Sequence, residues 1–287
     1  MSLIGTLTSG VSALRSFTKN LEIIGNNIAN VNTTSYKASR TTFADSFSNT
    51  LRTSTPSSGS TSNTSAMQVG TGVQMSHITA RFTQGVLTPT GYNTDLGVSG
   101  NGFFRVTSPD GTEYATRSGE FRIDDNKYLV TAQGYNVQGL TGGSGGTLPS
   151  TVGAIQLGTP PTGTELQSFS FDKAGYLVEF YSDGSSARTN QVLLQNFSDP
   201  TALMKEGNNL FTGFSAAGPI GGLTLSAANA PGSNGLGSIQ GGTLELANVD
   251  LTDEFANMIS TQRAFQASSR LISVSDQVLE EVVNLKR

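Results

Sequence analysis

Side chains able to carry enzymatic chemistry are scarce in this sequence of 287 residues. His77 is the single histidine, the residue type whose unperturbed pKa lies near neutrality, so a serine–histidine–aspartate triad would have to use it. The run from Gly142 to Gly146 matches the letters of a G-x-S-x-G nucleophile elbow around Ser144, but no apolar strand pattern precedes it and no helical pattern follows it. We therefore interpret the glycine run as a flexible linker and His77 as a structural or surface residue.

Other signatures of reactive or binding sites are incomplete. Asp124-Asp125-Asn126 contains oxygen ligands but lacks the EF-hand spacing, so a turn between strands explains it better. Gly97, Gly100 and Gly102 do not form a phosphate-binding glycine motif. The sequence has no cysteine, which excludes disulfides, thiolate metal sites and a cysteine nucleophile. We expect no catalytic residues, no metal and no cofactor, and hence a protein that is not an enzyme.

The composition indicates a turn-rich β protein with few charges. Charged residues make up 13% of the chain and glycine occupies 34 positions, as in β-structure with many short connections. The net charge of −4 and the scattered lysines and arginines lack the basic patch that nucleic-acid binding requires. No window reaches the roughly 18 consecutive apolar residues of a membrane span, and the first residues lack the pattern of a signal peptide. We therefore expect neither nucleic acid nor a membrane span.

Both ends of the chain carry the apolar spacing of an amphipathic helix. It predicts a helix over Leu3 to Ala29, about 40 Å long. It predicts a second helix from Leu251 to Arg287, which Asp250 caps and which acidic residues in the first turn favour. Each stripe could be an ordinary core face, but its position at a terminus favours pairing of the two helices as a coiled coil, or packing against other subunits. The stripe residues are Leu7, Val11, Leu14, Leu21, Ile28, Phe255, Met258, Phe265, Ile272, Leu279 and Val283.

Between the two terminal segments, short strand-like runs alternate with turn signals and predict short strands. The expected fold is therefore mainly β, with two long terminal α-helices and a β-rich central domain. Pro109-Asp110-Gly111, between Phe103–Val106 and Thr112–Ala115, is typical of a hairpin turn. The predicted segments are an N-terminal coiled-coil helix (1–31), an extended linker with a mobile Ser/Thr-rich loop (32–80), the first part of the β-domain (81–140), a hinge with a small insertion or second β-hairpin unit (141–191), the second part of the β-domain with a return linker (192–248), and a C-terminal coiled-coil helix (249–287).

The run Asn26-Asn27-Ile28-Ala29-Asn30-Val31-Asn32-Thr33-Thr34-Ser35-Tyr36-Lys37 resembles the signature that ends the N-terminal helix in flagellar rod and hook proteins. In that family a glycine usually stands where this chain has Ser35, which raises the question of a backbone with positive φ there. Further similar segments follow in the same order along the chain. The motif residues that the resemblance implies are Asn26, Asn27, Ala29, Asn30, Asn32, Thr33, Tyr36, Lys37, Gly100, Gly102, Phe103, Phe104, Arg117, Gly119 and Phe121.

The resemblance implies a structural subunit of the bacterial flagellum that polymerises with itself into a helical tube. The terminal helices would form the inner tube, with their stripe residues at subunit interfaces, and the β-domain would form the outer shell. The resemblance also implies export by the flagellar type III apparatus without a cleaved signal peptide. The implied partners are neighbouring rod, hook-cap and hook–filament junction proteins, and the implied location is the hook or basal body.

Two members of this family fit the sequence. Val137-Gln138-Gly139-Leu140 and the block from Asn196 to Phe211 favour the hook, a flexible joint that transmits torque. The short segment between Gly139 and Val192 leaves little room for the outer domain of a hook protein and favours the distal rod, a rigid drive shaft. We expect a hook subunit, with the distal rod as the alternative. An unrelated β-rich enzyme or adhesin with terminal packing helices is the third possibility.

Overall fold

The chain folds as two compact units, which we call the helical unit and the β unit. The computed structural model describes residues 3–57, 62–142, 150–158, 160 and 163–285. The helical unit holds the described residues of Met1–Asn30, Ala38–Arg81 and Val249–Arg287, and the β unit those of Val31–Lys37 and Phe82–Asn248. The chain therefore passes between the units four times, after Asn30, Lys37, Arg81 and Asn248.

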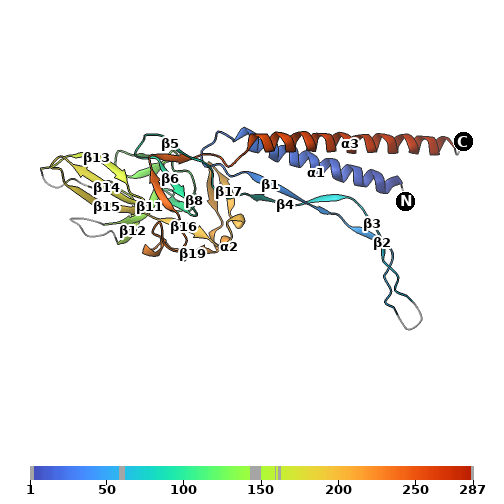
Figure 1. Ribbon diagram of the computed structural model, residues 1–287, viewed down its shortest axis with the longest axis horizontal. Coiled ribbons are helices and arrows are strands. Elements are labelled where there is room, and N and C mark those ends of the chain that lie inside the picture. Colours follow the sequence, from blue (N-terminus) through green and yellow to red (C-terminus); the bar gives the residue numbers. More distant parts are fainter. Residues whose placement is uncertain (1–2, 58–61, 143–149, 159, 161–162, 286–287) are drawn as a thin grey trace. The chain divides into compact units, whose positions relative to one another are not determined.

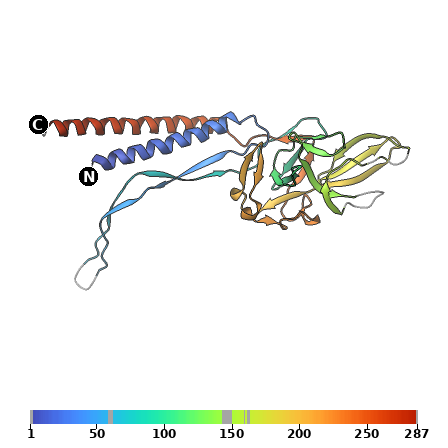
Figure 2. The same cartoon turned by 180° about the vertical axis from the view of Figure 1, so that it is seen from behind.

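Two long helices lie side by side in the helical unit, with the start of one beside the end of the other (Figure 1, and from behind in Figure 2). Helix α1 spans Leu3–Ala29 and helix α3 spans Leu251–Asn284. The Asp250 carboxylate accepts the backbone N–H groups of Thr252 and Asp253 at the start of α3. The predicted terminal helices and the Asp250 cap are confirmed. No helix within the described ranges is long and apolar enough to cross a membrane.

Polar pairs join α1 and α3 and fix their antiparallel register. The hydroxyl oxygens of Thr6 and Ser275 lie 3.4 Å apart near one end of the pair. Nearer the other end, Asn20 Nδ2 donates to Thr261 Oγ1 at 3.0 Å. A slip of one residue would break both contacts and leave polar groups without these partners, so such pairs specify register more than they add stability.

Several residues of α1 that contact α3 stand one position before a residue of the predicted stripe in the sequence. At Gly10 the two helices come close, because a Cβ added there would lie 2.9 Å from Ile272 Cγ1. Thr6 and Asn20, whose side chains contact α3, directly precede Leu7 and Leu21 in the sequence. Leu7 and Leu21 themselves are only half-buried. Hydrophobic periodicity alone overlooks a contact made by glycine, threonine and asparagine, and this explains the difference.

The predicted stripe of α3 faces α1 in part. Phe255 and Val283 are 49% and 65% exposed, so they lie outside the contact. Small polar residues alternate with the apolar ones along the contacting face. Its buried and half-buried members are Met258, Thr261, Phe265, Ser268, Ile272, Ser275 and Leu279.

A two-stranded antiparallel ribbon completes the helical unit. Strand β1 (Ser39–Asp45) pairs with β4 (Val73–Ala80), and β2 (Ser48–Arg52) pairs with β3 (Met67–Gly70). The sequence predicts an extended linker and a Ser/Thr-rich loop over residues 32–80, whereas the structure forms these four strands between Ser39 and Ala80. The connecting residues are rich in serine and threonine and carry no short hairpin signal, so local patterns do not reveal the pairing.

The described strands of the β unit form one large antiparallel sheet and two small pairs. The main path of the large sheet runs β13-β14-β15-β11-β7-β8-β18-β17, and β9, β10, β12, β16 and β19 join it off this path. The small pairs are β5–β21 and β6–β20. The bounds are β5 Leu87–Pro89, β6 Leu96–Ser99, β7 Phe103–Thr107, β8 Glu113–Thr116, β9 Phe121–Ile123, β10 Leu129–Thr131, β11 Asn136–Thr141, β12 Thr151–Ala154, β13 Leu166–Phe171, β14 Tyr176–Tyr181, β15 Ser186–Val192, β16 Leu194–Phe197, β17 Met204–Gly207, β18 Leu210–Thr212, α2 Phe214–Ala217, β19 Pro219–Ile220, β20 Ser238–Gly241 and β21 Thr243–Glu245, with 3₁₀ turns at Pro200–Ala202 and Ala227–Asn229.

Phe103 and Phe104 belong to separate hydrophobic clusters. Successive residues of a strand point to opposite faces of a sheet, so the Phe-Phe pair on β7 serves both clusters. Phe104 packs edge-on against Phe121, with ring centroids 5.2 Å apart. Phe103 packs in the same way against Phe197 at 5.6 Å. The predicted hairpin at Pro109-Asp110-Gly111 is confirmed, because β7 pairs with β8 across it.

We expect Gly10→Leu to destabilise the helical unit, since the new side chain would collide with Ile272, and overpacking of this kind costs about 1–3 kcal/mol. Gly25→Leu is the matched control: nothing lies within 4 Å of a Cβ at Gly25. Leucine also exceeds glycine in helix propensity by up to about 1 kcal/mol. Urea unfolding of the full chain, followed by circular dichroism, measures both variants. Equal losses of stability would contradict the close approach of α1 and α3.

Candidate functional site

The run Asn26–Lys37 is divided between the two units, with Asn26–Asn30 in the helical unit and Val31–Lys37 in the β unit. In each unit one part of this run belongs to a polar cluster. We call them the asparagine cluster, formed around Asn20 and Asn27, and the glutamate cluster, formed around Glu245.

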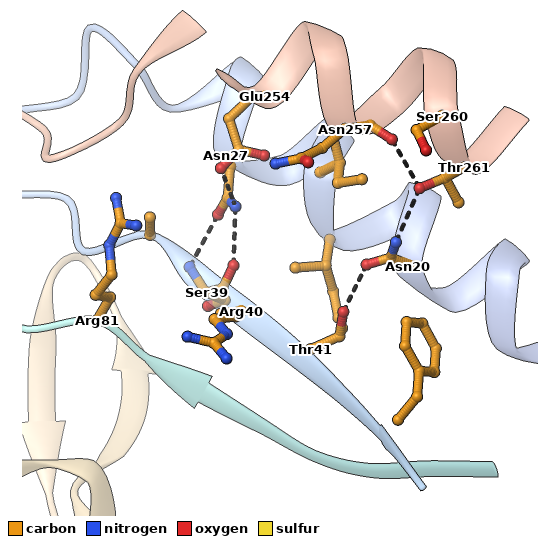
Figure 3. Close-up of a pocket in the computed structure, with 14 residues that line it drawn as sticks. Asn20, Asn27, Ser39, Arg40, Thr41, Arg81, Glu254, Asn257, Ser260 and Thr261 are labelled. Atoms are coloured by element: carbon orange, nitrogen blue, oxygen red, sulfur yellow. Dashed lines mark hydrogen bonds between the residues drawn. The ribbon is translucent and has the colours of Figure 1, made fainter. Parts of the chain in front are cut away.

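Asn27 is buried and links three elements of the helical unit (Figure 3). Its Nδ2 donates to the carbonyl oxygen of Ser39 at 2.9 Å and to Glu254 Oε1 at 3.2 Å. Its Oδ1 accepts the N–H of Ser39 at 2.9 Å. The amide thus reproduces the paired donor and acceptor of a strand at the first residue of β1, and also contacts the first turn of α3. An aspartate there could not donate, and a leucine could do neither.

Asn20 makes a similar link two helical turns earlier, on the same side of α1. Its Oδ1 accepts the Thr41 hydroxyl at 2.6 Å, and its Nδ2 donates to Thr261 on α3 (Figure 3). Thr261 in turn donates to the carbonyl oxygen of Asn257 at 2.7 Å. Asn20 and Asn27 therefore hold β1 and α3 against α1 at two points.

A cavity of about 310 Å³ lies between these elements (Figure 3). Its lining combines amide, hydroxyl and guanidinium groups and the Glu254 carboxylate with the apolar side chains of Ile23, Ile24, Ala38 and Phe43. Partial burial raises the pKa of the Glu254 carboxyl, while the hydrogen bond from Asn27 and the charge of Arg81 act against that rise. The polar part of this lining is able to form hydrogen bonds.

Ser35 adopts the left-handed backbone conformation, with φ of 57°, in the position where the family usually has glycine. It is buried in the β unit, where its N–H donates to the carbonyl oxygen of Glu245 at 2.7 Å and its hydroxyl donates to that of Arg117 at 3.0 Å. The conformation that the resemblance implied is thus present without glycine. These two hydrogen bonds offset the strain of a side chain at positive φ.

Glu245, at the end of β21, is buried between two cations from distant parts of the chain. Its Oε1 accepts Lys37 Nζ at 2.8 Å and the N–H of Gly85 at 2.7 Å, and its Oε2 accepts Arg117 Nε at 2.7 Å. Lys37 Nζ also donates to the carbonyl oxygen of Thr83 at 2.9 Å. Both carboxylate oxygens are therefore used by charge-assisted hydrogen bonds.

Burial and neighbouring charges shift the pKa values of Glu245 and Lys37 in opposite directions. Burial opposes ionisation of Glu245, but the nearby Arg117 and Lys37 cations outweigh it and hold the pKa of the Glu245 carboxyl below its ordinary value. Burial lowers the pKa of the Lys37 ammonium, and the charge of Glu245 counteracts this only in part.

Two glycines of the predicted motif serve the same cluster. The Arg117 guanidinium donates to the carbonyl oxygens of Gly100 and Gly102, and to that of Val98 at 3.2 Å. Gly100 and Gly102 have φ of 105° and 132°, values that side-chain-bearing residues rarely adopt. Gly119 meets a different constraint, since a Cβ there would lie 1.6 Å from the carbonyl oxygen of the first β6 residue.

The other motif residues lie around these clusters. In the helical unit, Asn30 Nδ2 donates to the carbonyl oxygen of Asn26 at 2.9 Å, and Ala29 is exposed at the end of α1. In the β unit, Asn32 is exposed, and the N–H of Tyr36 donates to the carbonyl oxygen of Thr33 at 3.3 Å. Sequence reasoning missed Asn20 and Glu245, because neither stands in a recognisable motif. The one available signal for Glu245 was that Lys37 and Arg117, if buried, need an acid.

The residues considered for enzymatic chemistry are not brought together. His77 is exposed on β4, with Nδ1 3.1 Å from the adjacent Ser76 hydroxyl. Asp124 forms the predicted turn, its carboxylate accepting the N–H of Tyr128 at 2.7 Å. Ser144 lies outside the described residues. Among the described residues, no group of three or more potential metal ligands is found.

Comparisons with known proteins match most of the chain. Residues 7–37 match a family described as flagella basal body rod protein, residues 97–179 the flagellar hook protein FlgE/F/G D1 domain, and residues 240–285 the flagellar basal body rod FlgEFG protein C-terminal region. The basal-body rod protein FlgG of Bacillus subtilis is 38% identical over 99% of this chain and 100% of its own length. The FlgG of Borreliella burgdorferi is 33% identical over 100% and 99%, and the hook protein FlgE of that organism is 24% identical over 99% and 100%.

We expect Glu245→Gln to destabilise the β unit by about 3–5 kcal/mol at neutral pH, because Lys37 and Arg117 would stay buried without a counter-charge. The control is Glu22→Gln, which breaks the exposed pair with Lys19 and should cost less than about 1 kcal/mol.

The stability of the β unit should also depend on pH. Since the pKa of Glu245 is lower in the folded chain than in the unfolded chain, the contribution of Glu245 to stability is complete above about pH 4.3 and is lost as the pH falls through the folded pKa.

Urea unfolding between pH 3 and pH 7 tests both statements. The Glu245→Gln chain should show a weaker loss of stability in acid than the parent chain. Parallel pH profiles of these two chains would contradict the ionised glutamate cluster.

Ser35→Gly should be tolerated within about 1 kcal/mol, because relief of strain at positive φ offsets the lost hydroxyl hydrogen bond. Ser35→Val should cost more than about 2 kcal/mol, since a β-branched residue is least compatible with this conformation. Thermal unfolding of the two variants gives the comparison, and a valine variant as stable as the glycine variant would contradict it.

Proposed function

Since this chain belongs to the family of flagellar rod and hook proteins, and is thus a structural subunit of the flagellar axis, we propose that it builds the basal-body rod. In this role it polymerises with copies of itself into a tube that acts as a stiff drive shaft. The observation that carries the choice of rod over hook is the similarity, along nearly the whole chain, to relatives named as rod proteins.

The comparisons favour the distal rod, which the sequence left as the alternative, over the hook, which was the main expectation. The hook relative is less similar, and its alignment extends over 448 positions because that protein is considerably longer. Between β11 and β15 of this chain, the described residues form only β12, β13 and β14, all of which belong to the main sheet.

The helical unit is the part of the chain best suited to assembly. Leu7, Leu14 and Leu21 form an apolar row on α1 beside its contact with α3, and they stay half-buried within the unit. Phe255 and Val283 are exposed on α3. Burying such side chains against neighbouring copies would contribute about 1.5–3 kcal/mol each, before the cost of ordering them. We propose that these predicted stripe residues contact neighbouring subunits.

We propose a structural role without catalysis. The buried acid of the β unit, Glu245, has both oxygens occupied by Lys37, Arg117 and a backbone N–H, so it serves folding. The proposed partners are copies of this chain, adjoining rod and hook proteins, and the flagellar type III export apparatus. The proposed location is the basal body. Contacts with hook-cap and hook–filament junction proteins would follow only from a hook position.

Deleting the gene and imaging isolated basal bodies tests the proposal. We expect basal bodies with incomplete rods and no hooks, because a missing rod segment leaves no base for the hook. Restoring the full-length gene is the control and should return complete rods with hooks. A complete rod that lacks only the hook would contradict the rod assignment and favour the hook.

A further inference from the structure

A groove runs along the helical unit between α1 and β4. Its volume is about 570 Å³, and its lining includes the apolar side chains of Leu7 and Val11 from α1 and of Val73 and Met75 from β4. Val11 is exposed and the other three are half-buried, so apolar surface in the groove remains in contact with water.

Two cations border this groove. Arg15 and Lys19 follow Val11 at intervals of four residues, so they continue along the same side of α1. Both are exposed. Lys19 pairs with Glu22 at 2.8 Å, a solvated pair that is easily exchanged. Arg15 forms no ion pair with any residue that the structure describes.

A second apolar surface, which we call the outer stripe, lies on α3. It consists of Leu271, Val274, Val278 and Val282. These residues are between 39% and 52% exposed. Ile272 and Leu279, on the face toward α1, each directly follow one of them, and one residue corresponds to a turn of about 100° around a helix. Leu271 also reaches that contact, since its Cδ2 would lie 3.7 Å from a Cβ at Gly10. The outer stripe therefore borders the α1–α3 contact, and its residues stay partly open to water.

Groove and outer stripe match in length and in charge. From Leu7 to Lys19 the groove side of α1 is about 18 Å long, and the outer stripe is about 17 Å long. The groove side of α1 carries Arg15 and Lys19 and no acid, and the acids on this part of α3 are Asp276, Glu280 and Glu281. Asp276 and Glu280 are each two residues from Val278, so they lie about 160° from it around the helix and away from the outer stripe. The third acid, Glu281, lies at the edge of the outer stripe, three residues after Val278.

We propose that the outer stripe of one copy docks into the groove of the next copy, with Glu281 facing Arg15. This inference rests on the proposed function and specifies one of its subunit contacts. Groove and stripe are different surfaces of the same chain, so the contact is heterologous. Each added copy leaves a groove free at one end of the row and a stripe free at the other, which is the arrangement that builds an open helical polymer.

The absence of native cysteine makes this contact testable by disulfide trapping. In the double variant Val11→Cys/Val278→Cys, a bond within one chain is excluded. The Thr6–Ser275 pair sets the register, and it places positions 11 and 278 about 12 Å apart along the helix axes. A disulfide requires Cα atoms within about 7 Å. Any disulfide between these positions must therefore join two copies.

Basal bodies from cells that carry this variant, treated with a mild oxidant, should give a ladder of covalently linked copies on non-reducing gels. The matched control, Val11→Cys/Gln277→Cys, moves one thiol by a single residue and about 100° around α3, and should give at least tenfold less product. Dilute purified chain should give no ladder. If the variant does not enter basal bodies, separately purified Val11→Cys and Val278→Cys chains, mixed and concentrated, should yield the mixed dimer.

Rods that assemble without a ladder, or with equal ladders from the variant and its control, would overturn the docking proposal and leave the rod assignment intact. For the purified chains, failure to form the mixed dimer would overturn it as well. Failure of the rod assignment itself has a different signature, since the deletion strain would then retain complete rods.

Discussion

Burial of the Glu245 carboxylate between Lys37 and Arg117 is the interaction on which the β unit depends. Removing these ions from water costs several kcal/mol each, and the cost is recovered only when every partner is in place. The partners come from segments around residues 35–37, 83–85, 98–102 and 117, so each segment is required to satisfy the others. Even the positive φ of Ser35 is held by carbonyl groups of Glu245 and Arg117. The cluster thus ties these distant segments of the β unit to one another.

The helical unit uses polar groups in a different way. Asn20 and Asn27 are neutral amides, so they hold β1 and α3 against α1 without burying a charge of their own. Nearer the start of α1, the two helices approach each other closely where Gly10 packs against Ile272. In this contact, amides and hydroxyls fix the register, and apolar side chains of α3 such as Ile272 pack beside them. Apolar side chains such as Val11 on α1 and Val274 on α3 remain exposed outside this contact.

The sequence predicted features that depend on neighbouring residues. The bounds of α1, the Asp250 cap and the turn at Pro109-Asp110-Gly111 all follow from local chemistry, and the family motif pointed to Lys37, Arg117 and the glycines that serve them. The sequence did not predict the buried position of Glu245 between Lys37 and Arg117, or the pairing of β1 with β4. These depend on partners distant in the chain, and a single sequence carries no local sign of them.

The four passages of the chain between the two units have a mechanical consequence. In a subunit of the flagellar axis under load, a unit attached by one peptide segment would place the entire load on that segment. Here the backbone connects the units at four places, so tension is divided among parallel covalent links. Cutting any one of them leaves three, and the β unit stays tethered to the helices that carry it.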